Sequence, residues 1–219
     1  MISEEQNKLL SKSFFWKFLG VLGSALVAYY TYASGLIENL IADGSFMGLL
    51  IAEVIVVILF SFLFRKLPYQ VVALLYFVYA MINGLTLSTI FYTFELNSIV
   101  YLFFAASIIF AIFSYIGTKT DKDLSNWSTL LTPVLIVGVI LSIINLVFLH
   151  SSVLDIALDW IILLVFFGIT VYDVNRLTSL QNEEYANEEK LHIYFAMQLY
   201  LDFINIFLRL LSIFGKSRD

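Results

Sequence analysis

The stretch Gln198–Leu211, QLYLDFINIFLRLL, places an aspartate, an asparagine and an arginine inside an otherwise apolar run. At helical spacing, its polar side chains recur at steps of four, three and four and therefore share one helix face. They are Gln198, Asp202, Asn205 and Arg209. Such a stripe would face solvent in a water-soluble protein, so its meaning depends on the rest of the chain.

The composition is that of a membrane protein. The 219 residues are 61% hydrophobic and only 13% charged, whereas soluble domains are about 25% charged. The net charge of −5 argues against binding to nucleic acid, which requires an excess of basic residues. The absence of cysteine excludes disulfides, thiol nucleophiles and Cys-ligated zinc, and the two histidines, His150 and His192, are far apart. We expect no tightly bound cofactor.

Seven apolar stretches are long enough to cross a bilayer core of about 30 Å as helices. Their runs are continuous and not alternating, which argues against membrane strands. The loops are short, so we predict an all-α protein with one domain, 1–219, built as a seven-transmembrane-helix bundle. The predicted spans are Phe14–Ala33, Phe46–Phe64, Val71–Phe91, Ile99–Ile116, Leu130–Leu149, Ala157–Val174 and Leu191–Phe214.

Basic residues alternate between the loops and predict an orientation, because cytoplasmic loops are enriched in Lys and Arg. The N-terminal segment and every second loop carry Lys8, Lys12, Arg65, Lys66, Lys119, Lys122, Arg176 and Lys190. The loops Gly35–Ser45, Tyr92–Ser98 and His150–Ile156 carry only acidic charges. We expect a cytoplasmic N-terminus and, after seven crossings, an outer C-terminus. Lys216 and Arg218 violate the rule there, which leaves a re-entrant last segment as the alternative.

Three carboxylates fall inside predicted spans, where a charge is costly unless it faces protein or water. They are Glu53, Asp173 and Asp202. At 1.5 Å per residue, Asp173 and Asp202 reach a similar depth in the cytoplasmic half, and Glu53 lies nearer the outer half. We expect Asp159, beside Trp160, to be interfacial. The polar stripe on the last span predicts that this helix occupies the centre of the bundle or lines a cavity.

Structural interpretations stand beside the functional ones. Asp173 is followed by Asn175 and Arg176, so it could mark a helix end in the headgroup region. Asp202 could form a structural pair with Arg209 or with hydroxyl groups of a neighbouring helix. Glu53 could likewise be structural. The third-span polar residues Asn83, Thr86 and Ser88 are typical of hydrogen bonds between helices.

Several motifs resemble the Bax inhibitor-1 family, also called the transmembrane BAX inhibitor motif family. Residues 199–205, LYLDFIN, followed by FLRLL at 207–211, resemble its last-helix signature. Gly84-Leu85-Thr86-Leu87-Ser88 resembles its third-helix motif, Lys122-Asp123-Leu124-Ser125 its loop between helices four and five, and Tyr172-Asp173 its sixth-helix pair. The ending, residues 212–219, resembles the bacterial branch that modulates the membrane protease FtsH.

This resemblance implies a seven-helix fold with a central last helix and a pH-dependent calcium leak. It implies that Asp173 and Asp202 form a di-aspartyl pH sensor and that Glu53 lies near the pore. Arg65 matches the basic cluster of which one arginine pairs with the sensor, and Asn205 and Arg209 are further candidates for the ion pathway or a latch. The bilayer, Ca²⁺, protons and a membrane protease are the partners implied, in a bacterial cytoplasmic membrane.

The chemistry of two neighbouring carboxylates at membrane depth supports a switch. Both cannot easily be ionised at low dielectric, so we expect Asp173 and Asp202 to share a proton and to titrate as a unit near neutral pH. A change in proton count would then tie or release two helices. Carboxylate, amide and hydroxyl oxygens are also the ligands that Ca²⁺ prefers, and a leak requires only transient binding.

Three other functions compete with a leak. A bundle that restrains a membrane protease would not need the aspartates. An intramembrane aspartyl protease also has two aspartates on neighbouring helices, but its Gly-x-Gly-Asp motif is absent here, where Leu199-Tyr200-Leu201 precedes Asp202. A retinal protein needs a lysine on the last span, which has none. We therefore expect a non-enzymatic protein.

Overall fold

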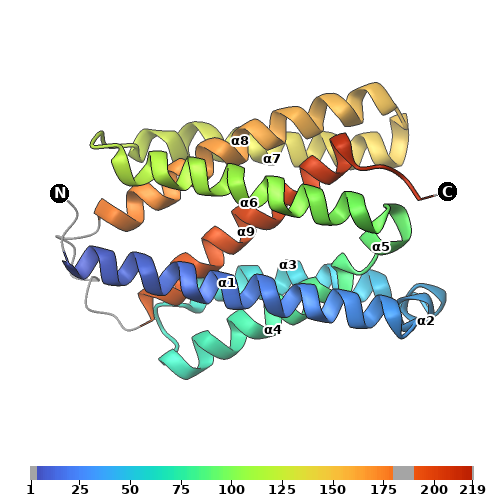
Figure 1. The fold of residues 1–219 in the computed structure, drawn as a ribbon, viewed down its shortest axis with the longest axis horizontal. Coiled ribbons are helices and arrows are strands. Elements are labelled where there is room, and N and C mark those ends of the chain that lie inside the picture. The colour runs from blue at the N-terminus through green and yellow to red at the C-terminus, as the bar shows by residue number, and fades with distance from the viewer. Residues whose placement is uncertain (1–3, 180–189, 219) are drawn as a thin grey trace.

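The computed structural model describes residues 4–179 and 190–218, and these form a bundle of long helices (Figure 1). Within that part no strand occurs, and Phe94 and Ser217 form an isolated antiparallel bridge. The helices are α1 (Glu4–Ala33), α2 (Leu36–Ala42), α3 (Ser45–Leu63), α4 (Tyr69–Leu87), α5 (Ile90–Thr93), α6 (Leu96–Lys119), α7 (Ser125–Ile144), a π-helical turn η1 (Asn145–Leu149), α8 (Ser152–Ser179) and α9 (Leu191–Phe214).

Seven of the described helical segments are long and apolar enough to cross a membrane, which confirms the predicted seven-helix bundle. Two features were not predicted. The third span reaches Thr93, but it is divided into α4, which ends at Leu87, and the separate α5. The predicted loop Gly35–Ser45 contains α2. Gly35 (φ 70°) and Gly44 (φ 79°) flank α2 in the left-handed conformation, which a residue without Cβ adopts at little cost. The chain turns at each of these glycines, and the segment between them forms the short helix α2.

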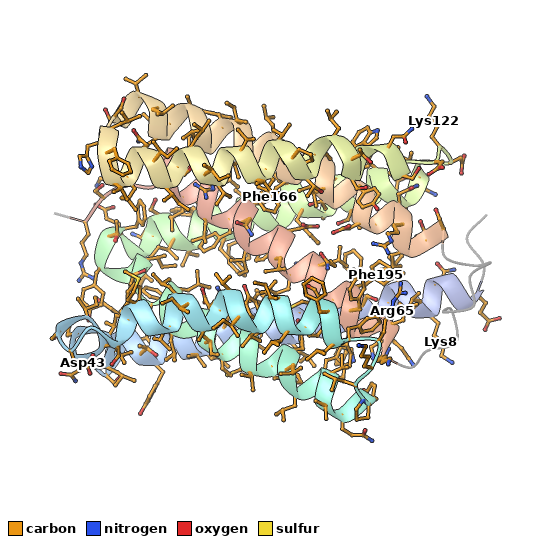
Figure 2. The ribbon with its side chains drawn as sticks, turned by 180° about the vertical axis from the view of Figure 1, so that it is seen from behind. Lys8, Asp43, Arg65, Lys122, Phe166 and Phe195 are labelled. Carbon is orange, nitrogen blue, oxygen red and sulfur yellow. The ribbon has the colours of Figure 1, made fainter. Side chains whose placement is uncertain are left out.

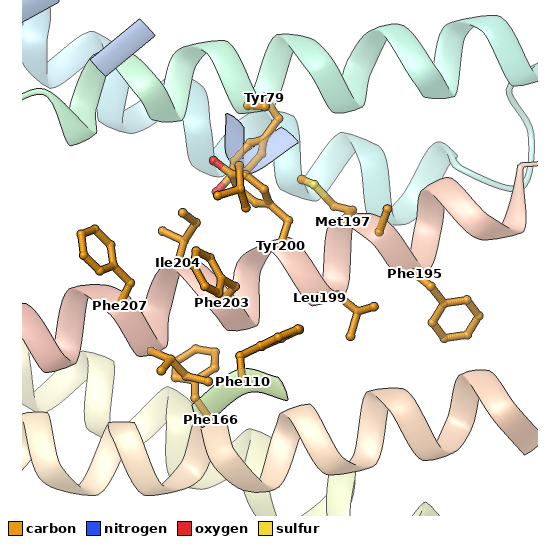
Figure 3. Close-up of a cluster of buried hydrophobic side chains, with 14 of the residues drawn as sticks. Tyr79, Phe110, Phe166, Phe195, Met197, Leu199, Tyr200, Phe203, Ile204 and Phe207 are labelled. Atoms are coloured by element: carbon orange, nitrogen blue, oxygen red, sulfur yellow. The ribbon is translucent and has the colours of Figure 1, made fainter. Parts of the chain in front are cut away.

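Helix α9 lies at the centre of the bundle and packs against α1, α4, α6 and α8. Figure 3 shows Tyr200 of α9 pointing toward Tyr79 of α4, with Phe166 of α8 on the other side of the helix. Ring contacts continue this packing, with Phe203 5.8 Å from Phe110 of α6. The central position predicted from the polar stripe is therefore observed.

Small residues bring neighbouring helices close together, as is usual within membranes. A Cβ at Gly84 of α4 would lie 2.7 Å from the backbone oxygen of Ser24 in α1. A Cβ at Gly117 of α6 would lie 2.7 Å from the backbone oxygen of Val171 in α8. The two glycines thus set the α1–α4 and α6–α8 distances.

The charged loops segregate to opposite ends of the bundle. Figure 2 shows Lys8, Arg65 and Lys122 at one end, which we call the basic end, and Asp43 at the other, the acidic end. Helix α9 runs from the basic to the acidic end, so the termini lie at opposite ends and the last segment does not re-enter (Figure 1). Part of the loop between α8 and α9, and Asp219, lie outside the described residues.

The basic residues of the C-terminal tail are held at the acidic end by specific partners. The Lys216 ammonium pairs with the Glu95 carboxylate at 2.5 Å. The Arg218 guanidinium donates to the Tyr32 hydroxyl at 2.5 Å and to the Phe91 carbonyl at 2.9 Å. These contacts explain how Lys216 and Arg218 are stabilised at the acidic end, although the charge pattern of the loops predicts basic residues at the other end.

Candidate functional site: a cavity with two buried aspartates

A cavity of about 540 Å³ lies between α7, α8 and α9. Both predicted sensor aspartates line it, Asp173 from α8 and Asp202 from α9. The other polar side chains around it are Ser128, Thr132, Tyr172, Arg176, Tyr194, Gln198 and Asn205. The cavity thus presents carboxylate, amide and hydroxyl oxygens inside an apolar bundle.

The two carboxyl groups are buried and near enough to interact electrostatically. The exposed fraction is 6% for Asp173 and 3% for Asp202, and the charge of Asp173 acts on Asp202. Asp202 Oδ2 is buried without a hydrogen-bond partner among the described residues. Since α8 continues to Ser179, Asp173 does not mark a helix end, and that structural interpretation is wrong.

Arg176 brings a positive charge to the rim of the cavity. It lies one turn beyond Asp173 on α8, interacts with that carboxylate electrostatically and lines the cavity together with Tyr194 of α9. Sequence reasoning treated Arg176 only as a loop charge. The signal that would have found it is its spacing of three residues from Asp173, which places both on one helix face.

Lys17 of α1 places a second positive charge inside the bundle, although it does not line the cavity. Its ammonium lies 4.0 Å from the ring centroid of Phe110 and 3.9 Å from that of Phe203. It also interacts electrostatically with Asp202. Sequence reasoning missed Lys17, although its position inside the predicted span Phe14–Ala33 was a signal.

Arg209 does not pair with Asp202, because it forms an ion pair with Asp159. The guanidinium nitrogen lies 2.5 Å from Asp159 Oδ1, and the Ser212 hydroxyl donates to Asp159 Oδ2 at 2.5 Å. Seven residues, about 10 Å along a helix, separate Arg209 from Asp202. Asp159 is itself buried, with only 6% of it exposed.

Glu53 belongs to a separate polar cluster on the α1–α4 side of α9. Its carboxylate accepts hydrogen bonds from Asn83 at 3.0 Å and from Thr86 at 2.7 Å. The Tyr200 hydroxyl donates to Asn83 Oδ1 at 2.7 Å and lies 2.6 Å from Ser24 Oγ. Tyr200 and Asp202 are two residues apart and so project to opposite sides of α9.

The remaining predicted candidates have different surroundings. Asn205 lines the cavity, and its amide donates to the Leu201 carbonyl at 2.8 Å. Arg65 is exposed in the loop between α3 and α4, does not line the cavity, and accepts a hydrogen bond from Lys190 at its carbonyl oxygen. The structure therefore brings Asp173, Asp202 and Asn205 together and places Glu53, Arg65 and Arg209 elsewhere.

No group of three or more His, Asp or Glu able to hold a metal occurs in residues 4–179 and 190–218. Two carboxylates cannot fill the six to eight oxygen positions that Ca²⁺ prefers. A calcium ion in this cavity would complete its shell with amide, hydroxyl and water oxygens. That donor set suits an ion in transit.

Comparisons with known proteins identify the family of the chain. A family model described as "Inhibitor of apoptosis-promoting Bax1" matches residues 6–219. The chain is 36% identical over 209 residues to inner membrane protein YbhL of Escherichia coli, covering 93% of this chain and 89% of the relative. It is 31% identical to an uncharacterized membrane protein of Streptococcus pyogenes, covering 96% and 93% of the two chains. The protein belongs to the Bax inhibitor-1 family.

Proposed function

We propose that this protein is a pH-sensitive calcium leak, switched by the proton count of Asp173 and Asp202. The observation that carries the proposal is the pair of buried carboxylates, from two helices, that line one cavity of about 540 Å³. Ca²⁺ is the transported ion, and the role is not enzymatic. The name of the Escherichia coli relative supports a place in the inner membrane.

The oxygen chemistry of the cavity supports a hard cation as the cargo. Amide and hydroxyl oxygens of Ser128, Thr132, Gln198 and Asn205 accompany the two carboxylates. Ca²⁺ accepts this mixture in flexible geometry, and a site with few charges releases it readily. The loop charges favour entry of a cation at the acidic end, because carboxylates attract Ca²⁺ and the lysines and arginines of the basic end repel it.

The position of the pair between α8 and α9 supports a switch. When one proton is shared, the two carboxyl groups attract each other, whereas two ionised groups repel. Adding or removing a proton therefore changes the free energy of holding α8 against α9 at this level. The Asp159–Arg209 ion pair joins the same helices nearer the acidic end and supplies a fixed point about which they can separate.

The test is calcium entry into dye-loaded liposomes that contain the purified protein. The pH is scanned from about 6 to about 8, because the aspartate pair is expected to titrate near neutral pH. Wild type is compared with Asp173→Asn and Asp202→Asn, and with Asp121→Asn as a control at an exposed loop carboxylate. We expect flux that changes with pH in wild type and in the control. Each sensor variant should lose or shift that pH dependence.

Two outcomes would overturn the proposal. Flux absent from wild type at every pH would remove the leak, and pH-dependent flux indifferent to both substitutions would remove the sensor. The second candidate function, modulation of a membrane protease of the FtsH type, predicts a different pattern. Co-expression of such a protease with wild type or with the double variant Asp173→Asn, Asp202→Asn should then give equal changes in its proteolysis.

A further inference from the structure

We propose that this protein holds one glycerophospholipid at its acidic end, with the lipid phosphodiester on Arg218 and one acyl chain in a cleft between α1 and α6. Two adjoining cavities of opposite character carry the inference, and Phe91 of α5 lines both. One is polar and lies where the helices end, and the other is apolar and lies deeper in the bundle. Together they match the two halves of a lipid. The inference goes beyond calcium flux and does not depend on it.

The polar cavity has a volume of about 330 Å³ and lies at the acidic end. The end of α1, the short α5, the start of α6 and the C-terminal tail all contribute to its lining. Tyr29 and Tyr32 of α1 line it together with Glu95 and Asn97 at the start of α6. Tyrosine rings are typical of the boundary between bilayer and water, so this cavity lies at the level of the lipid headgroups.

Arg218 supplies the group that would bind a phosphodiester. Its guanidinium donates two hydrogen bonds, both from Nη1, to the Tyr32 hydroxyl at 2.5 Å and to the Phe91 carbonyl at 2.9 Å. Its backbone N–H donates to the Thr93 carbonyl at 2.9 Å, which fixes the tail beside α5. The N–H groups on Nη2 and Nε have no acceptor among the described residues. A guanidinium fixed in this way can donate these N–H groups to phosphate oxygens.

The charge of the polar cavity suits an anion. Its one carboxylate, Glu95, is already paired with the Lys216 ammonium at 2.5 Å. Among the described residues that line the cavity, Arg218 is the only basic one, and its charge is left over. A phosphodiester carries one negative charge and would balance it. A lipid phosphate therefore gives a reason for an arginine at the end of the bundle where the loops are acidic.

The apolar cavity has a volume of about 70 Å³, enough for a few methylene groups. It lies between α1 and α6, and α9 crosses behind it (Figure 1). These two helices both pack on α9 but not closely on each other. Ala25 of α1 lines the cavity and is exposed on the outside of the bundle, so the cleft opens toward the bilayer. Ser24, the one polar residue in the lining, lies 2.6 Å from the Tyr200 hydroxyl, and the rest of the wall suits a hydrocarbon chain.

The test is native mass spectrometry of the purified protein in detergent, titrated with phosphatidylglycerol. The measured quantity is the lipid concentration at which half of the protein carries one lipid. Arg218→Gln should raise it about tenfold, because charge-assisted hydrogen bonds to the phosphodiester are lost. Arg218→Lys should keep most of the affinity, since an ammonium still binds phosphate as a point charge. Lys122→Gln, which removes an exposed basic residue at the opposite end, is the matched control and should bind like wild type.

Two further ligands separate the contributions of the headgroup and of the acyl chains. Diacylglycerol with the same chains lacks the phosphodiester, and inorganic phosphate lacks the chains. Each should bind at least tenfold more weakly than phosphatidylglycerol, because each can fill only one of the two cavities. Diacylglycerol that binds as tightly as phosphatidylglycerol would overturn the role of Arg218, and phosphate that binds as tightly would overturn the role of the cleft.

The cleft is tested by filling it. Ala25→Leu should raise the half-occupancy concentration about threefold or more, because the larger side chain takes the place of lipid methylene groups. Ala111→Leu, at an exposed position of α6 outside both cavities, is the matched control. Ala25→Val repeats the measurement if the leucine variant does not fold. Equal binding by Arg218→Gln and Lys122→Gln would overturn the inference, whereas absent calcium flux would overturn only the proposed function.

Discussion

Arg209 of α9 and Asp159 of α8 form an ion pair of 2.5 Å, and the pair also receives a hydrogen bond from Ser212. It joins the same two helices as the Asp173–Asp202 cavity but lies nearer the acidic end. One helix pair thus has a charge-neutral ion pair at one level and two carboxylates at another. In the proposed switch, the first stays closed while the second responds to protons.

Arg209→Met should lower the thermal stability of the purified protein. The substitution leaves the buried Asp159 carboxylate without its cation, which costs about 1–3 kcal/mol after allowance for the partly exposed guanidinium. The double variant Arg209→Met, Asp159→Leu should recover part of the loss, because no unpaired charge remains. Thermal unfolding in detergent checks both, and a double variant less stable than Arg209→Met alone would contradict the prediction. The pH midpoint of calcium flux should not move in the double variant.

Gly84→Ala should destabilise the packing of α1 on α4. The new Cβ would lie 2.7 Å from the Ser24 carbonyl oxygen and 2.8 Å from Val27 Cβ, and both atoms belong to α1. Forcing these helices apart costs about 1–3 kcal/mol. Gly48→Ala in α3 is the matched control, since no atom lies within 4 Å of its Cβ position. That control should be neutral or slightly stabilising, as alanine is a better helix residue than glycine. Equal melting temperatures for the two variants would contradict the close approach.

The sequence predicted the positions of the helices better than the contacts between their side chains. Continuous apolar runs define membrane helices because their length must match the bilayer, so all seven spans were found. The short α2 was missed because a helix of seven residues is too short to give the signal of a membrane span. The polar stripe located Asp202 and Asn205 correctly, but its periodicity could not show that Arg209 reaches across to Asp159. Lys17 was missed because its neighbours, Phe110 and Phe203, are distant in sequence and meet it only through packing.

Asp123→Ala should weaken the start of α7 in a pH-dependent way. The backbone N–H of Ser125 donates to Asp123 Oδ1 at 2.8 Å, and these hydrogen bonds hold the pKa of Asp123 below its ordinary value. A carboxylate with a lowered pKa stabilises the fold above its unfolded-state pKa and loses that contribution as the pH falls through its folded-state pKa. The melting temperature of the alanine variant should therefore fall below wild type near neutral pH, and the two should converge in acid. A difference that grows as the pH falls would contradict the prediction.

The absence of cysteine from the chain allows the orientation to be read without background, by labelling single-cysteine variants with a membrane-impermeant maleimide. Asp43 and Lys122 lie at opposite ends of the bundle and are both exposed (Figure 2). Because basic loops remain in the cytoplasm, Asp43→Cys should label in intact cells and Lys122→Cys only after the membrane is opened. Wild type should label in neither condition. The reverse pattern would place the basic end outside, and the aspartate cavity would then meet the external pH and not that of the cytoplasm.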